Sequence, residues 1–166
     1  MGSVAFIEER VLFSPDIPVE VNNLLQAAVA AASSVDQIKA EMLFLQAQTL
    51  DSHCLQTYFA LYKFYFFQKR LVDAERVVLA GLAESAKQGG FPNVYRCLVE
   101  NRKMWNGYAN ESTLFYLYTL KALAFIKLRL GFTLEAQLVL SHLQQLDPED
   151  LSGASVIMDL AAGVTE

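Results

Sequence analysis

The chain has 166 residues, a length that fits one domain able to bury its own core. Apolar residue types make up 54% of it and charged types 19%, a balance that excludes an intrinsically disordered protein and leaves apolar surface for a partner. The net charge is −5 and no basic run is longer than Lys69-Arg70, which argues against nucleic acid or an anionic membrane as a partner.

Helix-forming residues fill the intervals between a few clusters of glycine and proline. No interval shows sustained two-residue alternation, so we expect an all-α protein built from antiparallel helix pairs. The expected helices, in chain order, are Val21–Ala32, Val35–Leu50, Leu55–Lys69, Val72–Lys87, a candidate at Asn93–Met104, Thr113–Arg129, Leu134–Leu146, and a terminal helix from Gly153 or Ala154 to Ala162.

We expect a single domain over residues 1–166, with an N-terminal arm at 1–20, an insertion at 88–112 and a C-terminal helix and tail at 153–166. The first residues lack a basic region followed by a long apolar run, and every apolar stretch is interrupted before the ~18 residues that a membrane span needs. These features predict a cytoplasmic protein without a membrane span. Cys54 and Cys97 are too few for a disulfide framework, which predicts two buried free thiols.

The sequence repeats at one fixed spacing. Ala40 and Ala74 are 34 residues apart, and both stand where the second helix of a pair crosses the first most closely. The residues that follow them also correspond, since Phe44 and Ala47 match Val78 and Gly81 in size. A helix-pair repeat is therefore expected.

These positions resemble the tetratricopeptide repeat family. The first copy carries the pattern at Leu24, Ala27, Ala28, Ala40, Phe44 and Ala47; the second at Tyr58, Leu61, Tyr65, Ala74, Val78 and Gly81; the third at Leu120, Leu123, Ala124, Gly131, Ala136, Leu140 and Pro148. The departures are Ser52 and Ala86 in place of Pro, Tyr62 in place of a small residue, Lys127 in place of Tyr, and Leu143 in place of Ala. The resemblance implies a short superhelix of about three repeats with a terminal helix.

A narrower resemblance covers roughly Ala40 to Val164. The segments MLFLQAQTLDSHCLQTYFALYKFYF, ALAFIKLRLG and GASVIMDLAAGV are similar to small helical-repeat proteins encoded among nitrogen-fixation genes, including a factor that associates with nitrogenase. This resemblance implies a protein partner, such as the nitrogenase molybdenum-iron protein or a maturation intermediate. It brings no catalytic motif.

The repeat register divides the aromatic stretch LYKFYFFQKR into two stripes. Tyr58, Leu61 and Tyr65 fall on packing positions, and the other stripe lies on the side that forms the concave surface in this family. The expected partner-binding residues are Phe59, Lys63, Phe66 and Phe67, with Tyr118, Lys121, Phe125 and Arg129 in the third copy. Cations beside aromatic rings suit an acidic or amphipathic peptide. The alternative is that the insertion or the N-terminal arm covers Phe66 and Phe67.

The insertion contains the only tryptophan of the chain, in NRKMWNGYANES. Loops that interrupt a repeat often carry function. Trp105 and Tyr108 are therefore expected either to contact a partner or to cover the exposed end of the second helix pair.

No motif supports catalysis or a cofactor. His53 and Cys54 are adjacent, and no ligand spacing typical of a metal site accompanies them. The sequence predicts a non-catalytic adaptor or accessory factor that binds a protein, with self-association left open. The alternatives are a chaperone of the same repeat type that shields a secretion or assembly subunit and, less favoured, a helical enzyme or metal carrier.

Overall fold

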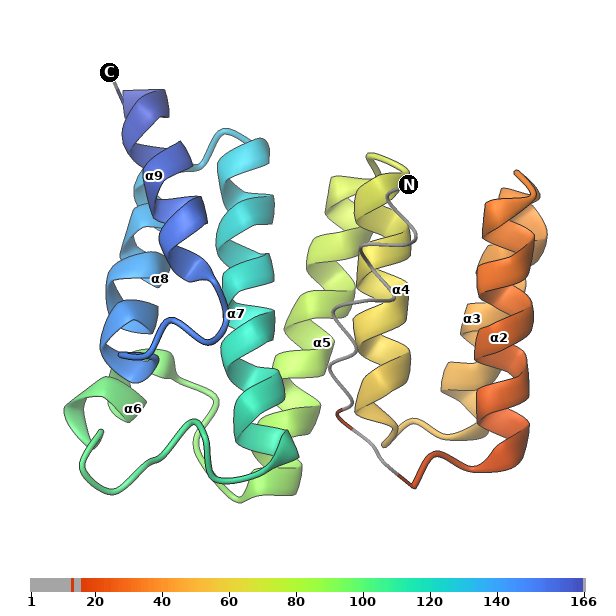
Figure 1. Ribbon diagram of the computed structural model, residues 1–166, viewed down its shortest axis with the longest axis horizontal. Helices are drawn as coiled ribbons and strands as arrows, with labels where there is room; N and C mark the ends of the chain where they lie inside the picture. Colours follow the sequence, from red (N-terminus) through yellow and green to blue (C-terminus); the bar gives the residue numbers. More distant parts are fainter. Residues whose placement is uncertain (1–12, 14–15, 166) are drawn as a thin grey trace.

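The computed structural model describes residue 13 and residues 16–165. These residues form eight helices and no strand, which confirms the expected all-α fold (Figure 1). The helices are α2 (Val19–Ser33), α3 (Gln37–Leu50), α4 (Leu55–Phe67), α5 (Leu71–Gly89), α6 (Tyr95–Glu100), α7 (Glu111–Arg129), α8 (Thr133–Leu146) and α9 (Ala154–Thr165). None of these helices is long and apolar enough to cross a membrane.

Most helices lie side by side as antiparallel pairs (Figure 1). α2 packs on α3, α4 on α5, and α7 on α8, while α6 and α9 both pack on α8. The contact between successive pairs is uneven, because α7 packs extensively on α5 whereas α4 makes much less contact with α3. The α2–α3 pair is therefore the more loosely attached end of the row.

One turn geometry joins the two helices of all three pairs. Val35, Lys69 and Gly131 have left-handed backbones, with φ of 67°, 61° and 91°. In each turn the N–H of the next residue donates to the carbonyl oxygen five residues earlier, at 2.9 Å, which is the Schellman pattern of helix ends. The same local structure thus recurs with the spacing predicted from the alanines.

Small residues lie where the second helix of a pair crosses its neighbours. Ala40, Ala74 and Ala136 each come five residues after the left-handed position and are completely buried. A Cβ added to Gly81 would stand 3.1 Å from Cζ of Phe115, so α5 and α7 are in close contact there. These positions exclude larger side chains for steric reasons.

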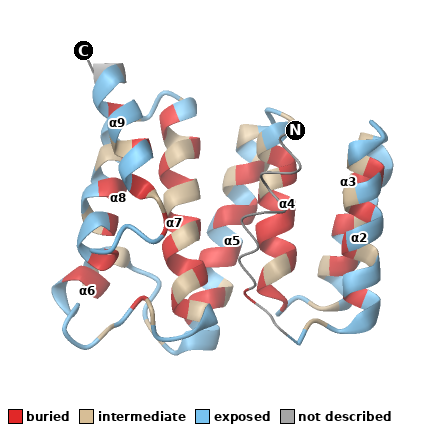
Figure 2. Ribbon diagram, in the orientation of Figure 1, coloured by how far each residue is buried: buried red, intermediate tan, exposed pale blue. Residues whose placement is uncertain are grey.

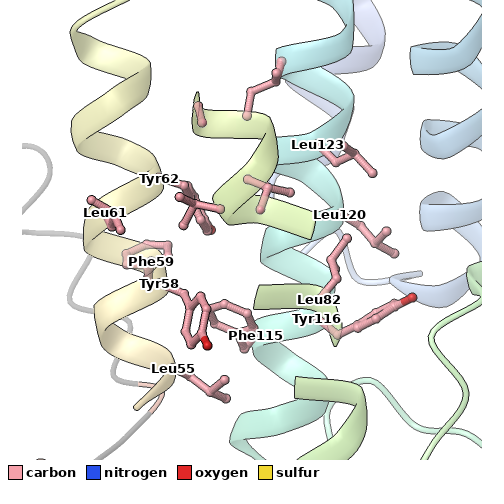
Figure 3. Close-up of a cluster of buried hydrophobic side chains, with 14 of the residues drawn as sticks. Leu55, Tyr58, Phe59, Leu61, Tyr62, Leu82, Phe115, Tyr116, Leu120 and Leu123 are labelled. Atoms are coloured by element: carbon pink, nitrogen blue, oxygen red, sulfur yellow. The ribbon is translucent and has the colours of Figure 1, made fainter. Parts of the chain in front are cut away.

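α4 is the central helix and is buried around most of its circumference (Figure 2). Figure 3 shows its apolar side chains meeting those of α5 and α7 in one cluster. Tyr58, Leu61 and Tyr65 are all buried, as the repeat register predicts. Leu61 and Tyr65 are almost without exposed surface.

A polar contact also recurs between successive pairs. The hydroxyl of Tyr65 in α4 donates to Glu41 Oε2 in α3 at 2.7 Å. Lys127 Nζ in α7 lies 2.9 Å from Glu75 Oε2 in α5. Each glutamate follows the buried alanine of its helix directly, and Lys127 occupies the repeat position of Tyr65. Lys127 therefore makes in the third pair the kind of contact that Tyr65 makes in the second.

The insertion differs in detail from the expected helix at 93–104. α6 ends at Glu100, where the side-chain amide of Asn101 donates to the carbonyl oxygen of Cys97 at 2.9 Å. Asparagine competes in this way for helical carbonyl groups, which favours a helix end. Of the expected N-terminal arm, residues 1–12 and 14–15 lie outside the described residues, and α2 already begins at Val19.

Candidate protein-binding site

Eight of the ten predicted partner-binding residues lie on α4 and α7, which are the first helices of their pairs. The rings of Phe66 and Phe125 meet edge to face with centroids 5.1 Å apart, so the two helices bring their predicted stripes together. Phe67 is 65% exposed, and Arg129 is exposed at the end of α7. The predicted residues on these two helices therefore belong to one region of the molecule.

The expectation that Phe59 lies on an open surface is wrong. Its side chain is only 5% exposed, and the ring of Phe13 packs on it edge to face with centroids 5.0 Å apart. Phe13 belongs to the segment before α2, which the repeat pattern does not include. Burial of Phe59 thus results from a contact between segments that are distant in sequence.

Phe13 fills a socket with aromatic walls. Its ring packs edge to face on Phe115 and Tyr118 of α7, with centroids 5.1 and 5.8 Å away, in addition to Phe59 of α4. The backbone N–H of Phe13 donates to Gln56 Oε1 at 3.4 Å. Phe13 is 2% exposed, so the socket is filled by the protein itself.

Cations stand beside these rings, as the sequence predicts. Lys63 Nζ lies 4.1 Å from the ring centroid of Phe59, and Lys121 Nζ lies 5.5 Å from that of Tyr118. Both distances are within the range of cation–π attraction. Positive charge therefore flanks the Phe13 socket on α4 and on α7.

A second feature, an open cleft, separates the C-terminal half of α2 from α4. It has a volume of about 370 Å³. Lys63 and Phe67 of the predicted set lie in its wall. Its other lining residues are Val29, Ala32, Ser33, Gln37, Phe44, Ala60, Phe64 and Gln68. A mostly apolar cleft with a few polar groups is typical of a binding site.

Gln37 contributes a polar group to this cleft. Its Nε2 donates to the carbonyl oxygen of Ala32 at 3.4 Å. Its Oε1 is buried and has no hydrogen-bond partner among the residues that the structure describes. A buried acceptor without a donor is costly, so this oxygen is a strained point in the cleft wall.

Trp105 and Tyr108 are placed apart from this region, in the loop between α6 and α7. The indole ring packs on Phe91 with centroids 5.2 Å apart. The Tyr108 hydroxyl donates to Asp147 and accepts from the N–H of Glu149 at 3.0 Å. Burial and the bond to Asp147 raise the pKa of Tyr108 to about 12. Both side chains thus make contacts within the protein. Trp105 lies near the end of the second helix pair, as the second alternative expects, whereas Tyr108 lies at the end of α8 in the third pair.

The candidate reactive groups do not converge. His53 Nδ1 lies 3.2 Å from Glu84 Oε2 on the exposed surface. Cys54 is buried and Cys97 is half-buried, and both are free thiols. Across residues 16–165 and residue 13, no three His, Cys, Asp or Glu side chains are grouped so as to hold a metal ion.

Two residues of the region were missed by sequence reasoning. Phe13 lies in a segment without helical periodicity, where only its isolated aromatic character gave a signal. Gln37 reads as an ordinary residue in the first turn of a helix. Comparison with protein-family models, with curated proteins and with solved structures found no match to the chain. Function is therefore inferred from the geometry of the described residues.

Proposed function

We propose that the protein is a non-catalytic adaptor that binds a segment of a protein partner in the cleft between α2 and α4. The observation that carries this proposal is the cleft itself, a mostly apolar volume of about 370 Å³ with Lys63 and Phe67 in its wall. An exposed phenylalanine beside a cation suits an amphipathic segment, whose carboxylates meet the lysine while its apolar side chains cover the ring.

The proposed architecture is a short superhelix of three helix pairs that resembles tetratricopeptide repeats. Three observations support it: the recurring left-handed turns, the buried alanine that follows each turn, and the contacts of Tyr65 and Lys127 with the preceding pair. In such an array the first helices of successive pairs line one surface. α2, α4 and α7 are those helices here.

The partner to test first follows from the narrower resemblance. We propose nitrogenase, through its molybdenum-iron protein or a maturation intermediate, and a role in which binding stabilises one state of that enzyme. A binding protein acts in this way whenever its affinity differs between the states of its partner. No reaction by the adaptor itself is needed.

The test is affinity purification of the tagged full chain from its native host, with variants. We expect the wild-type protein to retain a protein partner, without nucleic acid, and Phe67→Ala to lose it. Leu134→Ala is the matched control, because Leu134 is 81% exposed on α8 and does not line the cleft.

Equal recovery with Phe67→Ala and wild type would overturn the proposed site. Recovery of the chain alone would replace the adaptor with a homo-oligomer that buries its own aromatic surface. A secretion or assembly subunit in place of nitrogenase would support the chaperone alternative.

A further inference from the structure

We propose that the Phe13 socket is a subsite for an aromatic residue of the partner, and that the protein's own N-terminal segment competes for it. The inference deepens the proposed function and rests on it. The ligand class is a peptide that carries an aromatic residue near carboxylates. In the structure, the side chain of Phe13 occupies the site proposed for that residue.

The walls of the socket belong to the helices. Phe59 packs on Tyr62 of α4 with centroids 5.5 Å apart, and Phe115 is completely buried against the α5 crossing at Gly81. Core packing of this kind fixes side-chain positions. Departure of Phe13 would therefore expose a site that is already shaped.

Both the side chain and the backbone of Phe13 are bound in the socket. Its ring is enclosed by three aromatic rings, and its backbone N–H is bound by the side chain of Gln56. A side-chain amide that accepts from a backbone N–H does so whatever the side chain of that residue, while the ring pocket selects the residue type. The pair of contacts is thus suited to a peptide in trans as well as to this chain.

The socket is continuous with the open cleft. Lys63 lines the cleft and also lies over the ring of Phe59, which is a wall of the socket. Cleft and socket therefore adjoin along α4, and one peptide can enter both. Lys63 and Lys121 flank the socket with positive charge, which favours carboxylates next to the aromatic residue.

The segment that carries Phe13 has the composition expected of such a ligand. Glu8 and Glu9 precede Phe13 in sequence, and Asp16 follows it. An intramolecular ligand lowers the apparent affinity of a competing peptide by the fraction of molecules in which the site is open. The segment would in this way set the threshold for partner binding.

The test uses the chain's own segment as a probe. A synthetic peptide of residues 4–18, VAFIEERVLFSPDIP, carries fluorescein, and its binding to full-length proteins is followed by fluorescence anisotropy. We expect Phe13→Ala protein to bind the probe about tenfold or more tightly than wild type, because its socket is open. Val19→Ala, a change of an exposed residue in α2, serves as the control and should behave as wild type.

A probe that itself carries Phe13→Ala should lose its binding to the Phe13→Ala protein. Equal binding of the unmodified probe by wild type and Phe13→Ala, or no binding by Phe13→Ala, would overturn the inference. Phe13→Leu covers the case in which Phe13→Ala does not fold, since leucine fills most of the socket. It should bind the probe more tightly than wild type, and affinity equal to wild type would overturn the inference.

These outcomes are separable from those of the affinity purification. A partner that depends on Phe67 but binds wild type and the Phe13 variants equally would refute the competition and leave the proposed function intact. If recovery of the partner does not depend on Phe67, the proposed function is refuted, whether or not the peptide probe binds.

Discussion

Phe59 and Phe67 lie two helical turns apart on α4 in different surroundings. Phe59 is enclosed by Phe13 and the core, whereas Phe67 projects beside the open cleft. We expect Phe59→Ala to destabilise the fold by about 3 to 5 kcal/mol, as is typical of a buried phenylalanine. Phe67→Ala should change stability by no more than about 0.5 kcal/mol. The free energy of unfolding of both variants is measured with urea. A similar loss of stability in the two would contradict the assignment of Phe59 to the core and Phe67 to the surface.

Val35 has the most strained backbone conformation of the three left-handed residues in the recurring turns. It is a β-branched residue with φ of 67°, and its side chain is 79% exposed. A left-handed backbone costs such a residue roughly 1 to 2 kcal/mol, and little packing is lost when the side chain is removed. Val35→Gly should therefore stabilise the protein by about 1 kcal/mol, measured by urea unfolding.

The control for this change is Leu79→Gly, at an exposed position in the middle of α5. Glycine in a helix interior should lower stability by about 0.5 kcal/mol. If Val35→Gly is also less stable than wild type, the turn is not strained and the turn geometry is wrong.

For single residues, the sequence indicates which small side chains are buried, because close helix crossings leave no room for larger ones. Ala40, Ala74 and Ala136 could be predicted for that reason. The burial of Phe59 could not, since it depends on a contact with Phe13 that no local periodicity encodes. The exposure of Phe67 was predicted correctly.

Among the elements, the junction between α3 and α4 combines sparse packing with a strong polar contact. Arg70 binds Glu41 with two hydrogen bonds of 2.8 and 3.0 Å, and Tyr65 donates a third at 2.7 Å. The Arg70 guanidinium, together with the Tyr65 hydroxyl, holds the pKa of Glu41 below its ordinary value. The charged form of Glu41 thus attaches the α2–α3 pair to the rest of the protein.

This shift of the Glu41 pKa predicts a loss of stability in acid. Because the folded state lowers the pKa, the contribution is present above the ordinary value of 4.5 and is lost as the pH falls through the lower folded value. Glu41→Gln should be less stable than wild type at about pH 7, and the difference should shrink at about pH 3. Glu100→Gln, an exposed change at the end of α6, is the control in thermal unfolding. A difference that does not depend on pH would contradict the assignment.

The close crossing of α4 and α5 predicts the effect of a larger side chain. Ala74 is completely buried in α5, so Ala74→Leu should overfill the core and destabilise the fold by about 1 to 3 kcal/mol. Ala80→Leu places the same side chain on an exposed position of the same helix and should be nearly neutral. Thermal unfolding compares the two, and equal melting temperatures would show that the repeat register is wrong.

Elements as a whole were well predicted, since long segments of helix-forming residues end at glycine, proline or polar turns. The ends were less accurate: α6 stops at Glu100 because Asn101 bonds back to the helix, and α5 continues to Gly89. The difference in packing between the α5–α7 junction and the α3–α4 junction could not be predicted from the sequence. The repeat pattern marks the crossing within a pair, and the cleft arises between pairs.

In the whole molecule, three helix pairs stand in a row, and the two junctions between them differ (Figure 1). The α5–α7 junction is closed by core side chains, among them Leu82, Phe115 and Leu120 (Figure 3). The α3–α4 junction leaves the cleft beside Phe67 and Lys63. The cleft at the open junction is the place where we propose that the partner binds.

Photocrosslinking at the cleft tests this account most directly. p-Benzoylphenylalanine replaces Phe67 in one full-length protein and Leu134, which is exposed on α8, in another, and both are irradiated in the native host. The account predicts that position 67 crosslinks to a different protein and that position 134 does not. Crosslinks from position 134 alone, the same crosslinks from both positions, or crosslinks from position 67 only to further copies of this chain would contradict it.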